Sequence, residues 1–366
     1  MSHSYDGSKG IPRSSVAVRI EDDTQIGEAM RAADRLAAAL SFDPSARSNL
    51  SIVVSEAAHN IRRHAGRGEI VLRAVMRGDA AASQGLELLA LDKGPGMADV
   101  SQCLRDGFST AGTAGTGLGA IQRLSSFFAI YSRPGLGTAL LSYSWAGSAA
   151  GAAREAHEPT FMVAAVNRAL AGEPVCGDGW AVKQSPGRAV FLVVDGLGHG
   201  EDAAVAARAA LAAFEAVGTA HPGQPGTVLE RLHEAMTGTR GAAAAVAEWD
   251  EKQETVCFAG VGNIAGEIVS GAGSSRMVSH HGIVGYQVRR IQEFTYACPA
   301  DSLLLLSSDG IATLSSLAAY PGLAAQEPAL IAGVLYRDFN RERDDATIVV
   351  ARAAPRPRLP VQGFFR

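Results

Sequence analysis

The stretch from residue 92 to residue 119 constrains the fold of this chain most, because seven of its 28 residues are glycine. Glycine destabilises regular helices and strands, yet apolar runs flank this stretch on both sides. LELLALD before it predicts a buried strand that ends at Asp92, and LGAIQRLSSFFAIYS after it predicts a helix followed by a strand. A glycine-rich loop that opens into a helix amino terminus can bind phosphate through its backbone amides. We therefore expect a phosphate-binding loop, with a mobile surface loop as the alternative.

The composition fits a globular chain long enough for two domains. The chain has 366 residues, of which 47% are hydrophobic and 19% are charged, and its net charge of −4 argues against a nucleic-acid partner. The amino terminus lacks an apolar secretory segment, and no apolar run reaches the ~18 residues of a membrane-spanning helix. The cysteines lack CxxC spacing, which favours unpaired thiols over disulfides or a zinc site. We expect a soluble, cytoplasmic protein with no membrane partner.

The first part of the chain predicts one mixed sheet covered by a helical layer. Thr24 is the expected N-cap of the first helix, and Asp43 caps the second, with Pro44 at its first helical position. The expected helices are 24–42, 43–65 and one that starts at 118, and the expected strands are 15–20, 69–77, 86–92, 127–133 and 137–145.

The second part predicts a β-sandwich with helices on its faces, because it combines many short strands with few helices. The expected strands are 161–166, 177–184, 189–200, 243–250, 254–262, 266–271, 290–297, 302–310 and 346–352, and the expected helices are 201–218, 225–238 and 327–338. The small, polar residues 146–158 suit a linker. The fold class is therefore α+β, with domains at 15–145 and 159–353.

Polar side chains on the second expected helix point to a nucleotide site. Glu56 and Asn60 lie one helical turn apart and share one stripe of the helix. Mg²⁺ prefers oxygen ligands while it bridges substrate phosphates, so Asn60 is a candidate ligand, and Glu56 could accept a proton from an attacking hydroxyl. Asp92, at the end of its strand, is placed to accept a hydrogen bond from the amino group of a base. A solvated helix face is the alternative for Glu56 and Asn60 taken alone.

Three motifs resemble the N, G1 and G2 boxes of the GHKL (Bergerat) ATP-binding fold, which is shared by gyrase, Hsp90, histidine kinases and MutL. They are ExxxN at 56–60, DxGxG at 92–96 and GTGLG at 115–119. Because no phosphoacceptor-histidine dimerisation segment is present, the domain resembles the anti-sigma and stressosome serine kinases of the RsbW and RsbT kind, and the RsbT branch most closely. The resemblance implies bound ATP and Mg²⁺, with Asn60 on Mg²⁺, Glu56 as the base and Asp92 on adenine. The glycine-rich residues around the nucleotide would be Gly94, Gly96, Gly115, Thr116, Gly117, Leu118 and Gly119.

Acidic residues at the ends of apolar strands point to a metal site in the second part. Asp195 follows the run VFLVV and Asp309 follows SLLLL and two serines, and a carboxylate there is costly unless it is paired or bound to metal. GDG at 177–179 and RDDAT at 343–347 add further carboxylates. Oxygen ligands suit Mg²⁺ or Mn²⁺, and two such ions ~3.5–4 Å apart could activate a water for attack on a phosphate ester. Each Asp-Gly pair on its own would indicate only a turn.

Residues 159–353 resemble the metal-dependent PPM protein phosphatases, which have an αββα sandwich, and in particular the SpoIIE, RsbU and RsbX subgroup. The RsbX kind is the most similar. The resemblance implies two Mn²⁺ or Mg²⁺ ions, with Asp344 preferred over Asp345 as a ligand. His199 could hold a metal-bound water or only form a turn, and we favour the turn, while Asn263 in GVGN is a candidate for a structural role. The implied metal-binding residues are Asp178, Asp195, Gly196 through its carbonyl, Asp309 and Asp344.

The two resemblances together predict a bifunctional regulatory switch. The first domain would phosphorylate a Ser or Thr of STAS-domain antagonist or scaffold proteins with ATP, and the second would remove that phosphate. A sigma factor or a downstream phosphatase is a further candidate partner. One alternative is an ATP-sensing anti-sigma module fused to a phosphatase that is the only active enzyme. A non-enzymatic alternative is a module that sequesters a sigma factor.

Overall fold

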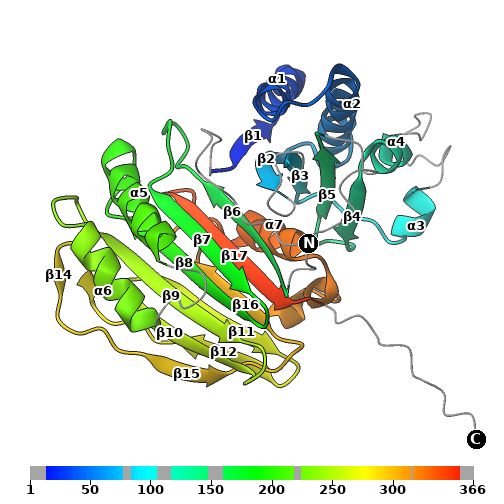
Figure 1. The fold of residues 1–366 in the computed structure, drawn as a ribbon. Helices are drawn as coiled ribbons and strands as arrows, with labels where there is room; N and C mark the ends of the chain where they lie inside the picture. Colours follow the sequence, from blue (N-terminus) through cyan, green and yellow to red (C-terminus); the bar gives the residue numbers. More distant parts are fainter. Residues whose placement is uncertain are drawn as a thin grey trace, which may run out of the picture.

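The computed structural model describes residues 14–76, 84–104, 117–146, 160–217, 224–314 and 316–354. Within them the chain builds two parts that lie side by side, each centred on β-sheet (Figure 1). The α+β class predicted from the sequence is confirmed. No helix in the described ranges is long and apolar enough to cross a bilayer. All four cysteines are free, as their spacing predicted.

The N-terminal part is a five-stranded sheet in the order β1-β2-β3-β5-β4, with helices on one face. Its strands are β1 (Val16–Ile20), β2 (Gly68–Met76), β3 (Gln84–Asp92), β4 (Phe127–Ser132) and β5 (Thr138–Trp145). Its helices are α1 (Asp23–Ala39), α2 (Pro44–Asn60), the π-helical turn η2 (Ile61–Ala65), α3 (Val100–Cys103) and α4 (Gly117–Leu124).

The prediction of a mixed sheet is wrong, because every strand pair of this sheet is antiparallel. The connection between β1 and β2 explains the difference. It contains two helices, which run in opposite directions, so β2 returns antiparallel to β1, whereas a single crossover helix would have made the pair parallel.

The start of α1 also differs from the expectation. Asp22, and not Thr24, is the N-cap, and its carboxylate accepts the backbone N–H of Thr24 at 2.8 Å. The side chain of Gln25 accepts the N–H of Asp22 at 2.9 Å and completes a capping box. The carboxylate of Asp22 thus takes the position that the sequence pattern gave to the Thr24 hydroxyl. The Asp43 cap of α2 is confirmed by its bond to the Ala46 N–H at 2.8 Å.

The C-terminal part is a β-sandwich, as predicted, built from the five-stranded sheets β15-β10-β9-β8-β7 and β12-β11-β16-β17-β6. Its strands are β6 (Phe161–Arg168), β7 (Asp178–Ser185), β8 (Arg188–Gly196), β9 (Ala242–Asp250), β10 (Thr255–Val261), β11 (Ala265–Ser270), β12 (Gly273–Met277), β13 (Gly282–Ile283), β14 (Gln287–Val288), β15 (Phe294–Ala297), β16 (Leu303–Ser307) and β17 (Ala346–Ala353). Its helices are α5 (Glu201–Ala216), α6 (Pro225–Ala235), the short 3-10 turns η4 (Leu317–Ala319) and η5 (Leu323–Ala325), and α7 (Pro328–Phe339).

Two strand predictions for this part need correction. The strand expected at 290–297 begins only at Phe294, and β12, β13 and β14 were not expected. β12 is glycine- and serine-rich and mostly exposed, and β13 and β14 have two residues each, so none of them carries the alternating apolar pattern of a half-buried strand.

The helices of the C-terminal part cover opposite faces of the sandwich. Between its two sheets lies a core that contains Phe161, Trp249 and Phe258, each with no exposed surface. α5 and α6 pack on the outer face of the sheet that holds β7 to β10. α7 covers the outer face of the other sheet, against β6 and β17. Two helical layers therefore enclose two sheets.

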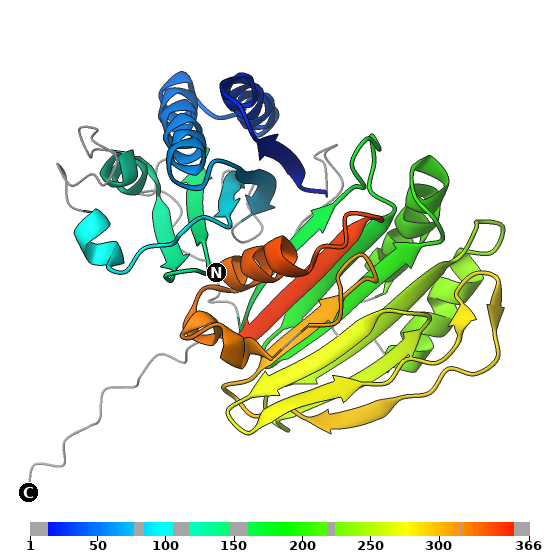
Figure 2. The same cartoon turned by 180° about the vertical axis from the view of Figure 1, so that it is seen from behind.

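α7 also covers the second face of the N-terminal sheet, so one hydrophobic core joins the two parts. This core includes Leu89 and Leu91 of β3, Leu335 of α7 and Ile348 of β17, all almost fully buried. The α7 ribbon lies between the N-terminal sheet and β17 in both views (Figures 1 and 2). Gly333 allows the close approach, because a Cβ there would lie 3.1 Å from Leu91 Cδ2, which would have to shift by a few tenths of an ångström.

Buried charges accompany the apolar contact. Arg73 forms a two-point ion pair with Glu87 at 2.9 and 2.8 Å, and the Tyr143 hydroxyl donates to the same carboxylate at 2.8 Å. The Arg73 guanidinium lies over the Trp180 ring of β7, 5.6 Å from its centroid. A second pair joins Arg168 of β6 to Glu69 of β2 at 3.3 Å. Such pairs favour one specific docking arrangement more than they add net stability.

Replacement of Leu335 by Ala should destabilise the whole chain by about 2–5 kcal/mol, because it removes buried side-chain volume from the shared core. Urea unfolding followed by circular dichroism measures the change. Ile52→Ala is the control, since Ile52 is 46% exposed and its loss should cost less than about 0.5 kcal/mol. Equal effects of the two substitutions would show that α7 is not packed between the two parts.

Candidate functional site

A cavity of about 330 Å³ opens beside the predicted nucleotide residues, within the size range of small-ligand sites. It lies between the end of α2, the end of β3, α3 and the start of α4. Its lining includes Asn60, His64, Asp92, Gly96, Met97, Cys103, Gly117, Leu118 and Thr138.

The start of α4 lies directly against the polar stripe of α2. A Cβ on Gly117 would lie 2.7 Å from Glu56 Oε2 and 3.5 Å from Asn60 Oδ1, so any side chain there would displace the Glu56 carboxylate. The amide nitrogen of Asn60 is buried and has no hydrogen-bond partner among the described residues. A buried amide without a partner costs about 1–3 kcal/mol, which a polar ligand in the cavity would relieve. α2 then passes into the π-helical turn η2, a feature often found at functional sites.

Asp92 is held at the cavity wall by backbone donors. Its Oδ1 accepts the N–H of Gly94 at 2.8 Å and the N–H of Thr138 at 3.2 Å. Burial raises the pKa of the Asp92 carboxyl above its ordinary value, and these two hydrogen bonds oppose that rise. Gly96 has φ +72°, and a Cβ there would lie 1.9 Å from the Arg133 carbonyl oxygen, so only glycine fits.

The described residues therefore bring most of the first predicted set together. Asn60, Asp92 and Gly117 line one cavity, and Glu56 lies beside it, against Gly117. Leu118 lines the same cavity, Gly94 and Gly96 shape the loop after Asp92, and Gly119 is buried inside α4. Gly115 and Thr116 lie outside the described residues. The sequence prediction did not select Thr138, the first residue of β5, which also lines the cavity.

In the C-terminal part, Asp178 of β7 and Asp195 of β8 are direct cross-strand partners. Like charges in that position repel each other. Burial raises the pKa of Asp178 to about 7, although the Ser308 hydroxyl donates to its Oδ2 at 2.6 Å. Burial, and then the charge of Asp178, raise the pKa of Asp195 to about 9. The pair is therefore a poor place for two negative charges unless a cation is bound.

The other predicted acids lie within electrostatic reach of this pair. The charges of Asp309 and Asp344 both raise the pKa of Asp195 further. Asp345 is buried, and its two oxygens accept the N–H groups of Leu170 at 2.7 Å and Gly177 at 2.8 Å. Because the oxygens of Asp345 are engaged by the backbone, the arrangement supports the preference for Asp344 as a metal ligand.

These residues fit a hydrated divalent cation. No three His, Cys, Asp or Glu side chains among the described residues form a closed metal-ligand group. Mg²⁺, however, usually keeps several waters and binds through one or two carboxylates. The opposed Asp178 and Asp195 offer such carboxylates. Gly196 follows them in the chain, and a Cβ there would lie 2.2 Å from the Ala203 carbonyl oxygen, so the position requires glycine.

Several supporting residues of this site were missed or assigned no metal role by the sequence prediction. Ser308 holds Asp178 and itself accepts the N–H of Thr347 at 2.9 Å. Both lie inside predicted motifs, SSDG and RDDAT, so the signal was present. Asn263 Nδ2 donates to Asp309 Oδ2 at 2.6 Å. His199 Nδ1 pairs with Glu173 Oε1 at 2.7 Å on the surface.

The two parts match two protein families. Residues 21–141 match the histidine kinase-like ATPase domain, and residues 185–354 match stage II sporulation protein E (SpoIIE). The chain thus joins an ATPase-type domain to a PPM-type phosphatase domain. It is 35% identical over 129 residues to the serine/threonine-protein kinase RsbT of Bacillus subtilis (strain 168). This match covers 35% of this chain and 94% of RsbT. The chain therefore belongs to the RsbT family in its N-terminal part and carries a SpoIIE-type phosphatase domain in its C-terminal part.

Solved structures show similar likenesses. A structure of the bacterial stressosome is 31% identical with a TM-score of 0.48, and the match covers 52% of this chain and 99% of that one. RsbX in complex with magnesium is 21% identical with a TM-score of 0.46, over 55% of this chain and 98% of RsbX. A fragment of SpoIIE from Bacillus subtilis with its phosphatase domain is 14% identical with a TM-score of 0.47, over 91% of this chain and 94% of the fragment.

In the absence of divalent metal, the free energy of unfolding should fall as the pH rises from about 4 to 9. The pKa values of Asp178 and Asp195 in the folded chain, about 7 and about 9, lie above the ordinary value of 3.8, so the folded state binds more protons than the unfolded state in this window. Asp195→Asn removes one of these protons, so its stability should depend less on pH. Unfolding in EDTA across this range measures both slopes, and equal slopes would contradict the assignment.

Proposed function

We propose that this chain is a two-activity switch protein. Its N-terminal part transfers the γ-phosphoryl group of ATP to a Ser or Thr of a STAS-domain protein, and its C-terminal part hydrolyses the resulting phosphoester. The observation that carries the proposal is that each part brings together the side chains that its proposed reaction needs. Glu56 and Asn60 lie against the start of α4, and Asp178 and Asp195 face each other across β7 and β8. At the family level these domains are a serine/threonine kinase and a protein phosphatase.

In the N-terminal part, each role follows from position. Asp92, whose carboxylate is fixed by two backbone donors, would accept a hydrogen bond from the amino group of adenine. Asn60 would hold the Mg²⁺ that accompanies ATP, and its unpaired amide would contact a phosphate oxygen. Glu56, on the same stripe, would accept the proton of the substrate Ser or Thr hydroxyl. The hydroxyl oxygen would attack the γ-phosphorus, and ADP would leave. The amides at the start of α4 would face the phosphates.

In the C-terminal part, Asp178, Asp195, Asp309, Asp344 and the Gly196 carbonyl would hold two Mg²⁺ or Mn²⁺ ions. When bound, these ions supply a water that is activated for attack on the phosphate ester. Hydrogen bonds support two of the carboxylates. The Ser308 hydroxyl fixes Asp178, and the Asn263 amide fixes Asp309. The side chains of Asp178 and Asp195 cannot both be charged at low cost without a cation. A bound metal would therefore stabilise the doubly charged pair, and the charged pair would in turn bind the metal.

The proposed partners follow from the relatives. RsbT is a serine/threonine-protein kinase, and the stressosome is the assembly with a similar solved structure. A STAS-domain antagonist or scaffold protein is therefore the proposed phosphoacceptor, and a sigma factor or a downstream phosphatase is a further partner in the same cytoplasmic pathway. If the N-terminal part only senses ATP, the phosphatase would be the single activity. The carboxylate of Glu56 beside Gly117 favours catalysis, because binding alone does not need a base there.

Glu56→Gln should lower phosphoryl transfer at least about 100-fold, because it removes the proposed general base. Transfer of labelled phosphate from ATP to purified candidate STAS proteins measures the loss, and ADP binding should stay close to that of the wild type. Ile52→Ala is the matched control on the exposed face of the same helix. Asn60→Ala should lose both transfer and tight binding of the Mg²⁺ nucleotide. Full transfer by Glu56→Gln would favour a different base, and no transfer by the wild type would favour the sensor alternative.

Asp195→Asn should abolish release of phosphate from a STAS protein that carries phosphoserine or phosphothreonine, and EDTA should abolish it in the wild type. The reason is that both treatments remove the proposed metal site. Asp301→Asn is the control, because Asp301 is an exposed turn residue and no part of the site. The kinase activity of Asp195→Asn should persist. Phosphate release by the wild type that is unaffected by EDTA, or by Asp195→Asn at the wild-type rate, would refute the metal-dependent phosphatase.

A further inference from the structure

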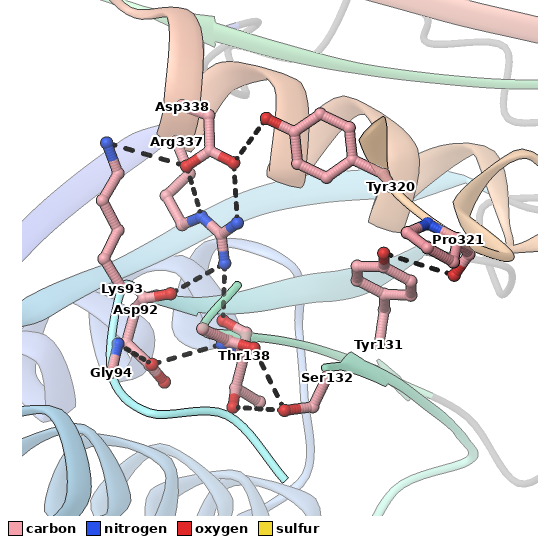
Figure 3. A network of polar contacts seen from close by, with 11 residues as sticks. Asp92, Lys93, Gly94, Tyr131, Ser132, Thr138, Tyr320, Pro321, Arg337 and Asp338 are labelled. Carbon is pink, nitrogen blue, oxygen red and sulfur yellow. Dashed lines mark hydrogen bonds and ion pairs between the residues drawn. The ribbon is translucent and has the colours of Figure 1, made fainter. Parts of the chain in front are cut away.

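Arg337 belongs to α7 of the C-terminal part, yet its side chain ends against the backbone of Asp92 and Thr138, two residues that line the nucleotide cavity of the N-terminal part. The side chain is only 6% exposed. Its Nη1 donates to the carbonyl oxygen of Asp92 at 2.7 Å and lies 3.5 Å from the carbonyl oxygen of Thr138 (Figure 3). The roles proposed above for the two sites do not use this residue.

The two carbonyls belong to the pair that positions the Asp92 carboxylate. Asp92 and Thr138 are direct register partners on β3 and β5, and the Thr138 N–H donates to Asp92 Oδ1 at 3.2 Å. Arg337 thus binds the backbone of the same two residues from the opposite side (Figure 3). A shift of this backbone would move the carboxylate that is proposed to read the base.

Arg337 is itself held in one orientation. Its Nε and Nη2 donate to the two oxygens of Asp338 at 2.9 and 2.8 Å. Asp338 also accepts the Tyr320 hydroxyl at 3.0 Å and pairs with Lys93 Nζ at 3.6 Å. Lys93 follows Asp92 in the chain, so the same network holds the loop at two successive residues (Figure 3). A planar guanidinium with several fixed donors suits this role better than a lysine would.

The N-terminal part is shaped to admit this side chain. Gly137 has φ +72°, and a Cβ there would lie 2.9 Å from Arg337 Nη1 and 2.1 Å from the Asp92 carbonyl oxygen. Any side chain at Gly137 would therefore press on both partners of the contact. The glycine before Thr138 leaves the space in which the guanidinium reaches the strand end.

We infer that Arg337 is a positioning residue of the nucleotide site, supplied to the kinase part by the phosphatase part. It fixes the backbone of Asp92 and Thr138, and through them the carboxylate that meets the adenine amino group. The inference rests on the proposed function in one respect, namely that the cavity binds an adenine nucleotide. It further implies that the N-terminal part binds adenine well only while α7 is docked on it.

Arg337→Ala should weaken ADP binding about ten- to hundredfold, the range expected for loss of a charge-assisted hydrogen bond. Calorimetric titration of the full chain with ADP and with GDP is the measurement. GDP has a carbonyl oxygen in place of the adenine 6-amino group that Asp92 would bind. The affinity for GDP should therefore be weak in the wild type and change little in the variant, so the ratio of ADP to GDP affinity should fall. In kinase assays the KM for ATP should rise while kcat stays within a few-fold. General loosening of the fold would weaken both nucleotides alike.

Arg133→Ala is the matched control, because the exposed Arg133 side chain donates to the Pro321 carbonyl and not, as Arg337 does, to the carbonyls of Asp92 and Thr138. It should bind ADP within about twofold of the wild type. Asp338→Asn keeps Arg337 but weakens its anchor, and should give a smaller loss of the same kind. This variant keeps the test open if Arg337→Ala does not fold. Arg337→Lys should restore part of the affinity, since one donor can still reach the carbonyl.

The outcomes separate the inference from the proposed function. If the wild type binds neither ADP nor ATP, the nucleotide site itself is wrong. If the wild type binds ADP and prefers it to GDP, but folded Arg337→Ala and Asp338→Asn do so equally well, the nucleotide site stands and the positioning role of Arg337 is refuted. An equal loss of ADP and GDP binding in Arg337→Ala would also refute it.

Discussion

The packing of α7 against two sheets at once is the constraint on which the rest of the structure depends. The N-terminal sheet has helices on one face only, and its other face is apolar, with Leu89 and Leu91 fully buried. Left open, that face would be a large apolar patch of a kind that soluble monomers rarely expose. α7 covers it and covers the β6–β17 face of the sandwich with its other side, so almost every residue from Pro328 to Tyr336 is buried. Neither part completes its core alone.

The same helix is hydrogen-bonded to loops of both candidate sites. Through Arg337 its last turn is bonded to the Asp92 loop. At the last residue of the helix, the Phe339 carbonyl accepts the Ala312 N–H at 2.7 Å, and just beyond it the Arg341 N–H donates to the Gly310 carbonyl at 2.9 Å. These bonds tie the end of α7 to the loop that follows Asp309, and Asp344 comes shortly afterwards in the chain. A nucleotide bound at the proposed Asp92 site and a metal bound at the proposed acidic site would therefore both act on α7. By thermodynamic reciprocity, any effect of one ligand on the affinity for the other must be mutual.

The sequence was informative where chemistry depends on local spacing. Glu56 and Asn60 share a helix face because four residues make one turn, and Asp178 and Asp195 mark strand ends that later proved to be cross-strand partners. Pairing directions were less accessible, because the antiparallel sheet follows from two helices in one crossover and not from any strand pattern. The contact of Arg337 with Asp92 spans 245 residues of chain and is set by the docking of α7, so no local motif encodes it. Gly115 and Thr116 of the predicted glycine-rich loop lie outside the described residues, and their roles stay predictions.

Amide hydrogen exchange of the full wild-type chain, with and without saturating Mg²⁺-ADP, tests most directly whether α7 joins the two sites. α7 is docked on the N-terminal part through Arg337 and the shared core. We therefore predict that nucleotide slows amide exchange in the loop after Asp92 and also in the last turns of α7, between Val334 and Phe339. Slower exchange should extend to the segment that leads to Asp344. Protection confined to the N-terminal part, with α7 exchanging at the same rate in both states, would contradict the account and leave two independent domains on one chain.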